Sequence, residues 1–262
     1  MLATNKDRRP TTTTPEAPRL GSFAGVVQHP ILESLACMTC PARKSDICGG
    51  MDDVEIRELA ASSHRVLLKV GDTLVWDGDG AQYSYVITRG ALRASKSSDD
   101  GRRQILDFLF SGQFVGIPSD AAYHFDVEVL TDAEVCRFEK RKLEQLMAKY
   151  PSVEKGYRTG LARQLEDAYE HAYALGRRTA MERVAAFLLD LRASSCAKTA
   201  TGVLKLPMTR GDIADFLGLT LETVSRAFSR LKSLGVIRLP SAQEVEIRDD
   251  ERLKALAGST GL

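Results

Sequence analysis

Three cysteines near the N-terminus have the spacing of a metal site. Cys37, Cys40 and Cys48 form a C-x2-C-x7-C pattern. In a reducing compartment, thiols at such short spacing indicate a metal or redox site rather than structural disulfides. Thiolates bind zinc and iron–sulfur clusters, and either centre typically takes four ligands. Cys48 is a candidate to join the Cys37–Cys40 pair, and the fourth ligand must come from elsewhere in the fold.

The remaining cysteines and the histidines favour a cluster over zinc. Structural zinc sites usually draw their ligands as two local pairs, and the sequence contains no second pair. The histidines are His29, His64, His124 and His171, and they show no zinc-knuckle spacing. The other two cysteines also have ordinary interpretations, because free cysteine is often buried. Cys136 fits a core position on a strand, and Cys196 fits a core position or an exposed loop.

A second motif, in residues 209–234, predicts a helix-turn-helix. Thr209 is expected to cap the first helix with Asp212 as its reciprocal partner. Gly218 stands where the tight turn needs a positive φ, and Thr220 is expected to cap the second helix. The predicted buried faces are Ile213, Ala214 and Leu217 in the first helix, and Val224, Ala227, Phe228 and Leu231 in the second. Two helices joined in this way form a DNA-binding unit.

The outer face of the second helix carries side chains suited to reading bases. Arg226 can donate two parallel hydrogen bonds to guanine, Glu222 can accept one from cytosine, and Ser225 is adaptable. Each also has a plainer interpretation, since an acid in the first turn favours the helix dipole and an arginine can simply be solvated. Phosphate contacts that set the register are predicted for Thr209, Arg210 and Thr220. Strands at 236–239 and 244–247 would complete a winged version of the motif.

Charge and composition narrow the class of protein. The net charge is only +1, but residues 177–238 contain eleven Lys or Arg against five Asp or Glu, which favours a polyanionic partner. No run of about 18 apolar residues predicts a membrane span. No apolar stretch follows the basic N-terminal residues, so we expect a cytoplasmic protein without a secretory signal. No Ser/His/Asp set, phosphate loop or paired-carboxylate motif suggests an enzyme.

The elements that must position these motifs fall into four segments. Residues 1–30 are polar and aperiodic, which predicts a disordered tail. Residues 31–150 hold the cysteines, a short helix at 52–62, glycine-punctuated β-strands and a helix at 142–150. The predicted strands are 73–76, 83–88, 104–108, 127–130 and 135–138, and such a series indicates a sandwich, barrel or roll. Residues 151–178 are one long helix, and residues 179–262 contain a further helix and the winged motif. The fold class is therefore α+β.

The long helix carries a narrow apolar seam. Its members step along the helix by 4, 3, 4 and 3 residues, and they are Leu161, Leu165, Ala168, Ala172 and Leu175. Such spacing is typical of a coiled-coil contact of about two heptads. The alternative is a helix that packs only on its own domain. Because the seam is narrow and lies between two domains, we expect a homodimer.

These parts together resemble the FNR branch of the Crp/Fnr superfamily of bacterial regulators, over residues 30–248. The most specific likeness is Thr-Arg-Gly-Asp-Ile at 209–213 and Leu-Gly-Leu-Thr at 217–220, followed by Glu-x-x-Ser-Arg at 222–226. The resemblance implies an N-terminal β-roll, a long dimerisation helix and a C-terminal winged helix. It also implies a palindromic DNA target with TTGAT-type half-sites, and recruitment of RNA polymerase by the anaerobic dimer.

The resemblance also supplies the ligand set. It implies an oxygen-labile [4Fe–4S] cluster held by Cys37, Cys40, Cys48 and Cys136. The gap of seven residues before Cys48 is longer than in the best-known enteric members. A thiol-redox signal, nitric oxide or a structural zinc stays an open alternative. Cyclic-nucleotide-binding relatives carry Glu and Arg in a phosphate cassette, whereas residues 112–119 here, GQFVGIPS, have neither. We therefore expect no cyclic nucleotide, because no side chain there would pair with its phosphate.

Overall fold

The computed structural model describes residues 37–117, 121–193 and 202–258. The cysteine segment comes first and is helical. It consists of η1 (Pro41–Lys44), α2 (Asp46–Gly49) and α3 (Asp53–Ala61). Asp52 caps α3 by accepting hydrogen bonds from the backbone N–H groups of Val54 and Glu55, and Glu55 returns a bond to the cap. This capping box explains why the helix begins where polar residues precede an apolar run.

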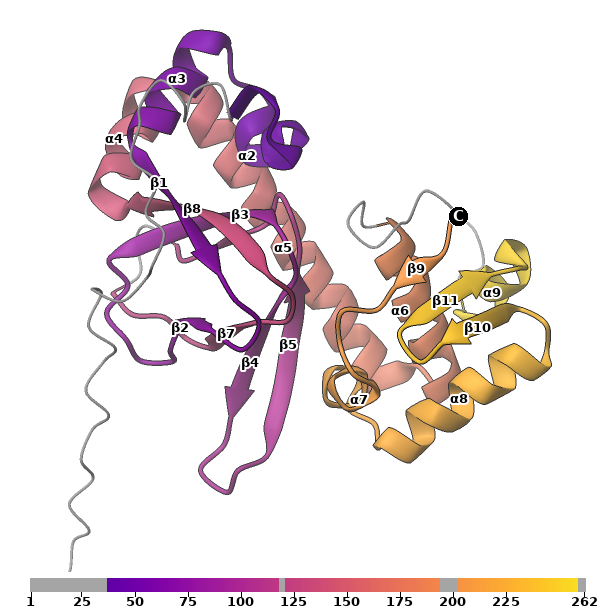
Figure 1. The fold of residues 1–262 in the computed structure, drawn as a ribbon. Helices are drawn as coiled ribbons and strands as arrows, with labels where there is room; N and C mark the ends of the chain where they lie inside the picture. The colour runs from indigo at the N-terminus through magenta and orange to yellow at the C-terminus, as the bar shows by residue number, and fades with distance from the viewer. Residues whose placement is uncertain (1–36, 118–120, 194–201, 259–262) are drawn as a thin grey trace, which may run out of the picture.

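Two four-stranded antiparallel sheets follow and form the β-roll (Figure 1). One sheet has the order β1-β8-β3-β6 and the other has the order β2-β7-β4-β5. The strands are β1 (Ser63–Leu68), β2 (Thr73–Val75), β3 (Tyr83–Arg89), β4 (Leu92–Ser97), β5 (Arg103–Leu109), β6 (Phe114–Val115), β7 (Asp126–Val129) and β8 (Ala133–Glu139). Buried residues of both sheets belong to one apolar core, so the two sheets pack face to face. The predicted roll is confirmed.

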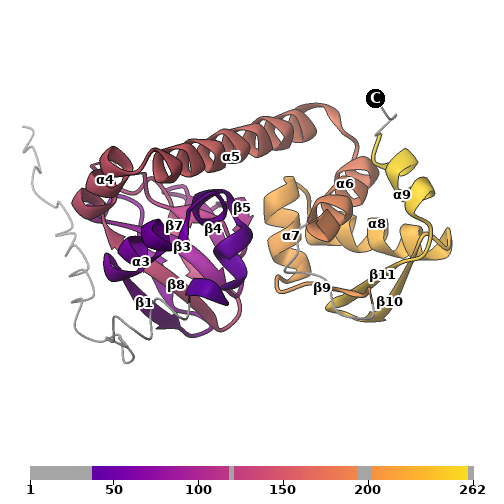
Figure 2. The ribbon, with the colours of Figure 1, turned by 90° about the horizontal axis from the view of Figure 1, so that it is seen from above.

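Three helices connect the roll to the C-terminal domain. They are α4 (Lys140–Lys149), α5 (Pro151–Arg177) and α6 (Ala180–Ala193). Pro151 occupies the first turn of α5, where its missing N–H costs nothing. Figure 2 shows α5 running past the roll, from α4 to the C-terminal domain that begins with α6.

The C-terminal domain is a winged helix-turn-helix. It contains β9 (Leu204–Lys205), α7 (Arg210–Leu217), α8 (Leu221–Ser233), β10 (Ile237–Ser241), β11 (Glu244–Ile247) and α9 (Asp250–Leu256). The three short strands pair in the order β10-β11-β9. One apolar core includes α6, α7, α8 and the wing, and it also takes in Ile105 and Phe108 from β5. The roll therefore packs directly on the DNA-binding domain.

The predicted elements agree with the observed ones to within about two residues. The pattern did not reveal β1, β4, β6, β9, η1, α2 or α9. The short elements among these offer too few residues for a period to show. The predicted tail, residues 1–30, and Cys196 lie outside the described residues. Within the described part of the chain, no helix is long and apolar enough to cross a bilayer.

Candidate metal centre and nucleic-acid interface

Four cysteines from two distant parts of the chain surround one cavity. Cys37, Cys40 and Cys48 belong to the helical N-terminal segment, and Cys136 lies in β8, between Arg65 of β1 and Val86 of β3. All four side chains line the same cavity, which encloses about 380 Å³ of unfilled space, including the part open to solvent. The pairing of β8 with β1 and β3 therefore brings Cys136 to the three N-terminal cysteines.

The four cysteines lie in an apolar environment. Burial and the neighbouring cysteines disfavour the charged thiolate forms of Cys48 and Cys136. Burial, together with the nearby Cys40 and Cys37, raises the pKa of Cys48 to about 12. Burial also raises the pKa values of Cys136 and Cys40. Reactive cysteines need lowered pKa values, because the thiolate is the nucleophile. In the metal-free protein these groups are therefore poor nucleophiles, and a bound metal centre is what would make thiolates of them.

The four cysteines line one cavity, but they do not converge on the position of a single ion. Within the described residues, no three His, Cys, Asp or Glu side chains converge where a single metal ion could be held. A zinc site needs its sulfurs about 2.3 Å from one ion. A four-iron cluster takes one cysteine on each iron, so its ligands are spread around a larger object. A set of four cysteines that do not meet at one point fits a cluster better than one ion.

Two arginines flank the cysteines. Arg43 donates from one guanidinium nitrogen to the carbonyl oxygen of Met51 at 2.7 Å and from another to the carbonyl oxygen of Cys48. Arg65 lies opposite Cys136 in the sheet and pairs with Glu134 at 3.1 Å. A four-thiolate cluster carries net negative charge, so two guanidinium groups at its edge suit it. Neither arginine was predicted, because only the folded chain places them there.

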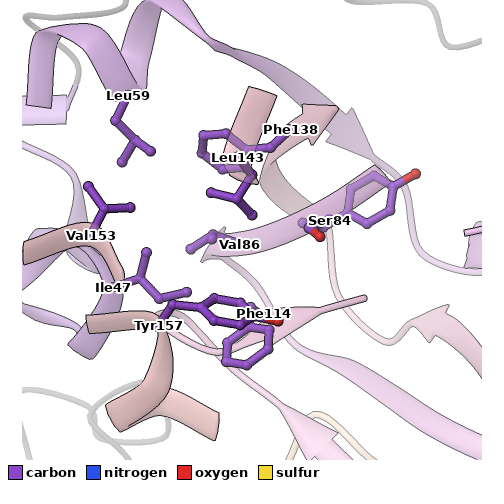
Figure 3. Close-up of a pocket in the computed structure, with 10 residues that line it drawn as sticks. Ile47, Leu59, Ser84, Val86, Phe114, Phe138, Leu143, Val153 and Tyr157 are labelled. Atoms are coloured by element: carbon purple, nitrogen blue, oxygen red, sulfur yellow. The ribbon is translucent and has the colours of Figure 1, made fainter. Parts of the chain in front are cut away.

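An apolar pocket adjoins the cysteine cavity (Figure 3). Leu59, Val86 and Phe138 line both spaces. In Figure 3, Ile47 of α2, Leu59 of α3, Val153 of α5 and Tyr157 of α5 point toward one another across the pocket. The Tyr157 ring also lies 4.8 Å from that of Phe114. This packing joins the cysteine segment to the first turns of α5, so a change at the cysteines has a direct path to the long helix.

The predicted apolar seam of α5 is partly buried and partly exposed to solvent. Leu161 packs against the core beside the cysteines, and Leu175 is half-buried near Gly218. The other three members, Leu165, Ala168 and Ala172, are exposed. The apolar side chains left in solvent are Leu165 at 52% exposure, Tyr169 at 67% and Tyr173 at 57%. The spacing alone missed the two tyrosines, because they stand one position after Ala168 and Ala172.

The helix-turn-helix has the predicted local geometry. Thr209 accepts a hydrogen bond from the backbone N–H of Asp212 at 3.0 Å, and the Asp212 carboxylate accepts from the Thr209 N–H at 2.9 Å. Gly218 ends α7 in the left-handed conformation, with φ 61°. Thr220 caps α8 by accepting from the Thr223 N–H at 3.2 Å. All the core residues predicted for the two helices are buried.

The predicted base-reading residues lie together on the exposed face of α8. Arg226 donates to the Glu222 carboxylate at 2.5 Å, one helical turn away. Ser225 donates from its hydroxyl to the carbonyl oxygen of Leu221 at 2.8 Å. The Glu222–Arg226 pair is solvent-exposed, so it costs little to open. Both side chains can therefore exchange their mutual contact for base edges.

The three predicted phosphate-binding residues have different surroundings. The Thr209 and Thr220 hydroxyls serve as helix caps, and both residues are exposed. The guanidinium of Arg210 instead lies 3.3 Å above the ring centroid of Phe228. Burial lowers the pKa of Arg210 to about 10. Arg210 therefore also serves the packing of α7 on α8.

Ion pairs connect the roll to the first helix of the motif. Arg93 of β4 donates to the Asp212 carboxylate at 2.6 Å, and Arg103 of β5 donates to the same group at 3.0 Å. Arg103 also reaches Asp215 at 2.6 Å. The sequence predicted only a capping role for Asp212. No local pattern predicts its ion pairs, because 109 to 119 residues separate the partners. Arg183 of α6 adds a bond to the carbonyl oxygen of Leu217 at 2.8 Å.

Comparison with known proteins settles the family. Residues 182–256 match the Crp-like helix-turn-helix domain, and residues 65–150 match the cyclic nucleotide-binding domain. The nitrogen fixation regulation protein FixK of Bradyrhizobium diazoefficiens is 36% identical over 224 residues, which is 85% of this chain and 94% of that protein. The chain belongs to the Crp/Fnr family of DNA-binding transcriptional regulators.

Other members agree along nearly their whole length. The transcriptional activator protein FnrL of Cereibacter sphaeroides is 35% identical over 231 residues, covering 85% of this chain and 92% of that protein. Among solved structures, FixK2 from Bradyrhizobium japonicum matches with a TM-score of 0.69 and 34% identity, over 74% of this chain and 96% of that one. The roll, the long helix and the winged helix are thus the Crp/Fnr fold.

Proposed function

We propose that this Crp/Fnr regulator is a cytoplasmic oxygen sensor that holds a [4Fe–4S] cluster on Cys37, Cys40, Cys48 and Cys136. The observation that carries the proposal is the placement of Cys136 on the same cavity as the three N-terminal cysteines. Such a cluster supplies an oxygen-labile link between the ligands that hold it. FnrL is named as a transcriptional activator and FixK as a regulator of nitrogen fixation, and neither name reports a metal.

The cysteines would act by tying the N-terminal segment to β8. Ile47 and Leu59 then press on the first turns of α5 through the apolar pocket. The exposed stripe of Leu165, Ala168 and Ala172, widened by the tyrosines beside it, would pack against a second copy. When the link between the N-terminal segment and β8 is lost, these contacts no longer favour the dimer-competent position of α5, and the dimer weakens. Each 1.4 kcal/mol changes the population about tenfold, so a modest bias is enough.

The dimer would present two α8 helices to one palindrome of TTGAT-type half-sites, one DNA turn apart. Arg226 and Glu222 would read base edges, with Ser225 as an adaptable contact. Thr209, Arg210 and Thr220 would contact phosphates and set the register. The bound dimer would then recruit RNA polymerase to activate transcription. We expect no cyclic nucleotide in the roll, since Gln113 accepts a hydrogen bond from the Phe110 N–H at 2.8 Å and carries no charge.

The same geometry bears on the alternatives to an oxygen-sensing cluster. A thiol switch without metal is disfavoured because burial raises the pKa of Cys48 and Cys136, and a neutral thiol reacts slowly. A structural zinc is disfavoured by the lack of a point of convergence among the described ligands. Nitric oxide would act on the same cluster and is a second signal of the same site.

The test is an absorption spectrum with iron and sulfide assays on protein purified without oxygen, repeated after exposure to air. We expect about four irons per chain, a broad visible absorption and bleaching in air. DNA affinity for a TTGAT palindrome, measured by fluorescence anisotropy against a scrambled duplex, should fall with the bleaching. Zinc, or no metal, would refute the cluster and leave the family assignment intact.

A further inference from the structure

The helix α7 carries a carboxylate that bonds both to its own helix and to the roll. One oxygen of Asp212 caps α7, accepting from the N–H of Thr209 at 2.9 Å and from its hydroxyl at 2.7 Å. The other oxygen accepts from Arg93 at 2.6 Å and from Arg103 at 3.0 Å. The Asp212 side chain is only 5% exposed. A capping acid needs neither arginines nor burial, so the second set of bonds serves something other than the cap.

The two arginines are themselves held in place by further carboxylates. Arg93 of β4 is also bound by Glu128 of β7 at 2.9 Å. Arg103 of β5 binds both Asp212 and Asp215, which lies three residues further along α7. A planar guanidinium that donates to two carboxylates fixes their directions as well as their distances. These bonds therefore hold the rotation of α7 about its axis relative to the roll.

Aromatic contacts hold the C-terminal half of α7. The Phe216 ring lies 5.2 Å from that of Phe108 in β5 and 5.9 Å from that of Phe187 in α6. The His171 ring of α5 stacks on it at 4.1 Å, with 11° between the planes. The Gln104 side chain of β5 donates to the Phe216 carbonyl oxygen at 3.1 Å. One residue of α7 thus contacts the roll, the long helix and α6, and Figure 2 shows α7 on the side of its domain that faces the roll.

The recognition helix α8 follows any movement of α7. The Arg210 guanidinium of α7 lies 3.3 Å above the Phe228 ring of α8. Ile213 of α7 and Val224 of α8 are fully buried in the same core. The two helices therefore behave as one unit, and the contacts that fix α7 on the roll and α5 also fix the direction of α8 relative to α5.

We propose that Arg93 and Arg103 are positioning residues that set the spacing between the two DNA half-sites that a dimer can bind. With Asp212 and Asp215 they form an interdomain latch that fixes α8 relative to α5. In a dimer built along α5, that geometry determines the separation and relative rotation of the two α8 helices. Half-sites lie one DNA turn apart, and one added base pair rotates one half-site by about a tenth of a turn. The inference rests on the dimer and the palindrome of the proposed function.

The test measures DNA affinity by fluorescence anisotropy for full-length wild type and Arg103→Ala, each purified without oxygen. Three duplexes carry two TTGAT half-sites, at the one-turn spacing or at a spacing one base pair longer or shorter. We expect wild type to prefer one spacing clearly. Arg103→Ala should bind that duplex about tenfold more weakly, because the unlatched domain holds the competent orientation only about a tenth of the time. Its affinities for the three spacings should become nearly equal.

Two controls separate positioning from a local defect. Arg102→Ala changes the same residue type one position earlier, where the arginine pairs with Asp100, and should keep the wild-type spacing preference. A duplex with a single half-site should bind all three proteins equally, because one α8 needs no set direction. Arg103→Ala leaves Asp212 capped and paired with Arg93, so α7 should stay folded. An unchanged spacing preference in Arg103→Ala, or an equal loss on the single half-site, would overturn the latch.

A second readout needs neither DNA nor a cluster. Ile105 and Phe108 of β5 are buried in the core of the C-terminal domain, so release of α7 uncovers β5. Hydrogen exchange followed by mass spectrometry should be faster for residues 104–109 and 210–217 in Arg103→Ala than in wild type or Arg102→Ala. Equal exchange in all three proteins would overturn the latch. A wild type that does not bind the palindrome would refute the proposed DNA target, and the exchange rates would still decide whether the latch exists.

Discussion

The DNA-binding end and the cysteine end of this molecule place their functional residues in different ways. At the DNA-binding end, the working residues lie within 18 positions of one another, from Thr209 to Arg226. They are placed by caps, a glycine turn and one helical period. At the cysteine end, Cys48 and Cys136 are joined only because β8 pairs with β1 and β3. The DNA-binding end is therefore locally determined, and the cysteine end depends on the whole roll.

The largest effect should come from removing the long-range ligand. We expect Cys136→Ala to abolish iron binding in protein purified without oxygen, because three cysteines on one short segment leave the fourth iron without a thiolate. Cys196→Ala is the control and should keep the wild-type iron content. Iron retained in Cys136→Ala but lost in Cys196→Ala would show that the cysteine end is assembled differently.

The DNA-binding end should be most sensitive at its core. Phe228 is buried in α8 and supports the Arg210 guanidinium. We expect Phe228→Ala to lower the free energy of unfolding by about 3–5 kcal/mol, measured by urea denaturation. Leu221 is exposed on the same helix, so Leu221→Ala should change stability by less than about 0.5 kcal/mol. Similar losses in both variants would contradict the observed packing.

Base reading should respond to a single side chain without loss of fold. Arg226→Ala should weaken binding to the TTGAT palindrome by about 1–3 kcal/mol per half-site and relax the preference for guanine. The loss is specific, because the exposed Arg226 side chain pairs with the equally exposed Glu222 and supports no core packing. Lys232→Ala, at the far end of α8, is the control. A uniform loss across all DNA sequences would assign Arg226 to phosphate instead.

The connection between the two ends should be measurable as a coupling energy. Arg103 and Asp215 join β5 to α7 at 2.6 Å, and both side chains are about one-third exposed. A double-mutant cycle on Arg103→Ala and Asp215→Ala should give about 0.5–1 kcal/mol of interaction in urea denaturation. The neighbouring Arg102 pairs with Asp100 in the same turn. Cycles that join Arg102 to Asp215 should give a coupling near zero.

The last prediction concerns pH. Burial, with the nearby Asp167 of α5, raises the pKa of Asp107 to about 7 from its ordinary 3.8. The folded state therefore binds more protons than the unfolded state between these values, so the free energy of unfolding should fall as pH rises from about 4 to about 7. Asp107→Asn should flatten this part of the pH profile. An unchanged profile would show that Asp107 titrates normally.

The amino-acid sequence by itself determined the local parts of this protein. Capping pairs, the left-handed Gly218 and the helical spacing of apolar residues depend on neighbours a few positions away, so the helix-turn-helix and its outward-facing residues could be predicted. The strand pattern and the C-x2-C-x7-C spacing likewise indicated a roll and a metal centre. Only the tertiary structure decided which seam residues face outward and that Arg65 stands opposite Cys136. It also decided that Arg93 and Arg103 bind α7, because such contacts depend on strand pairing and domain packing that no local period encodes.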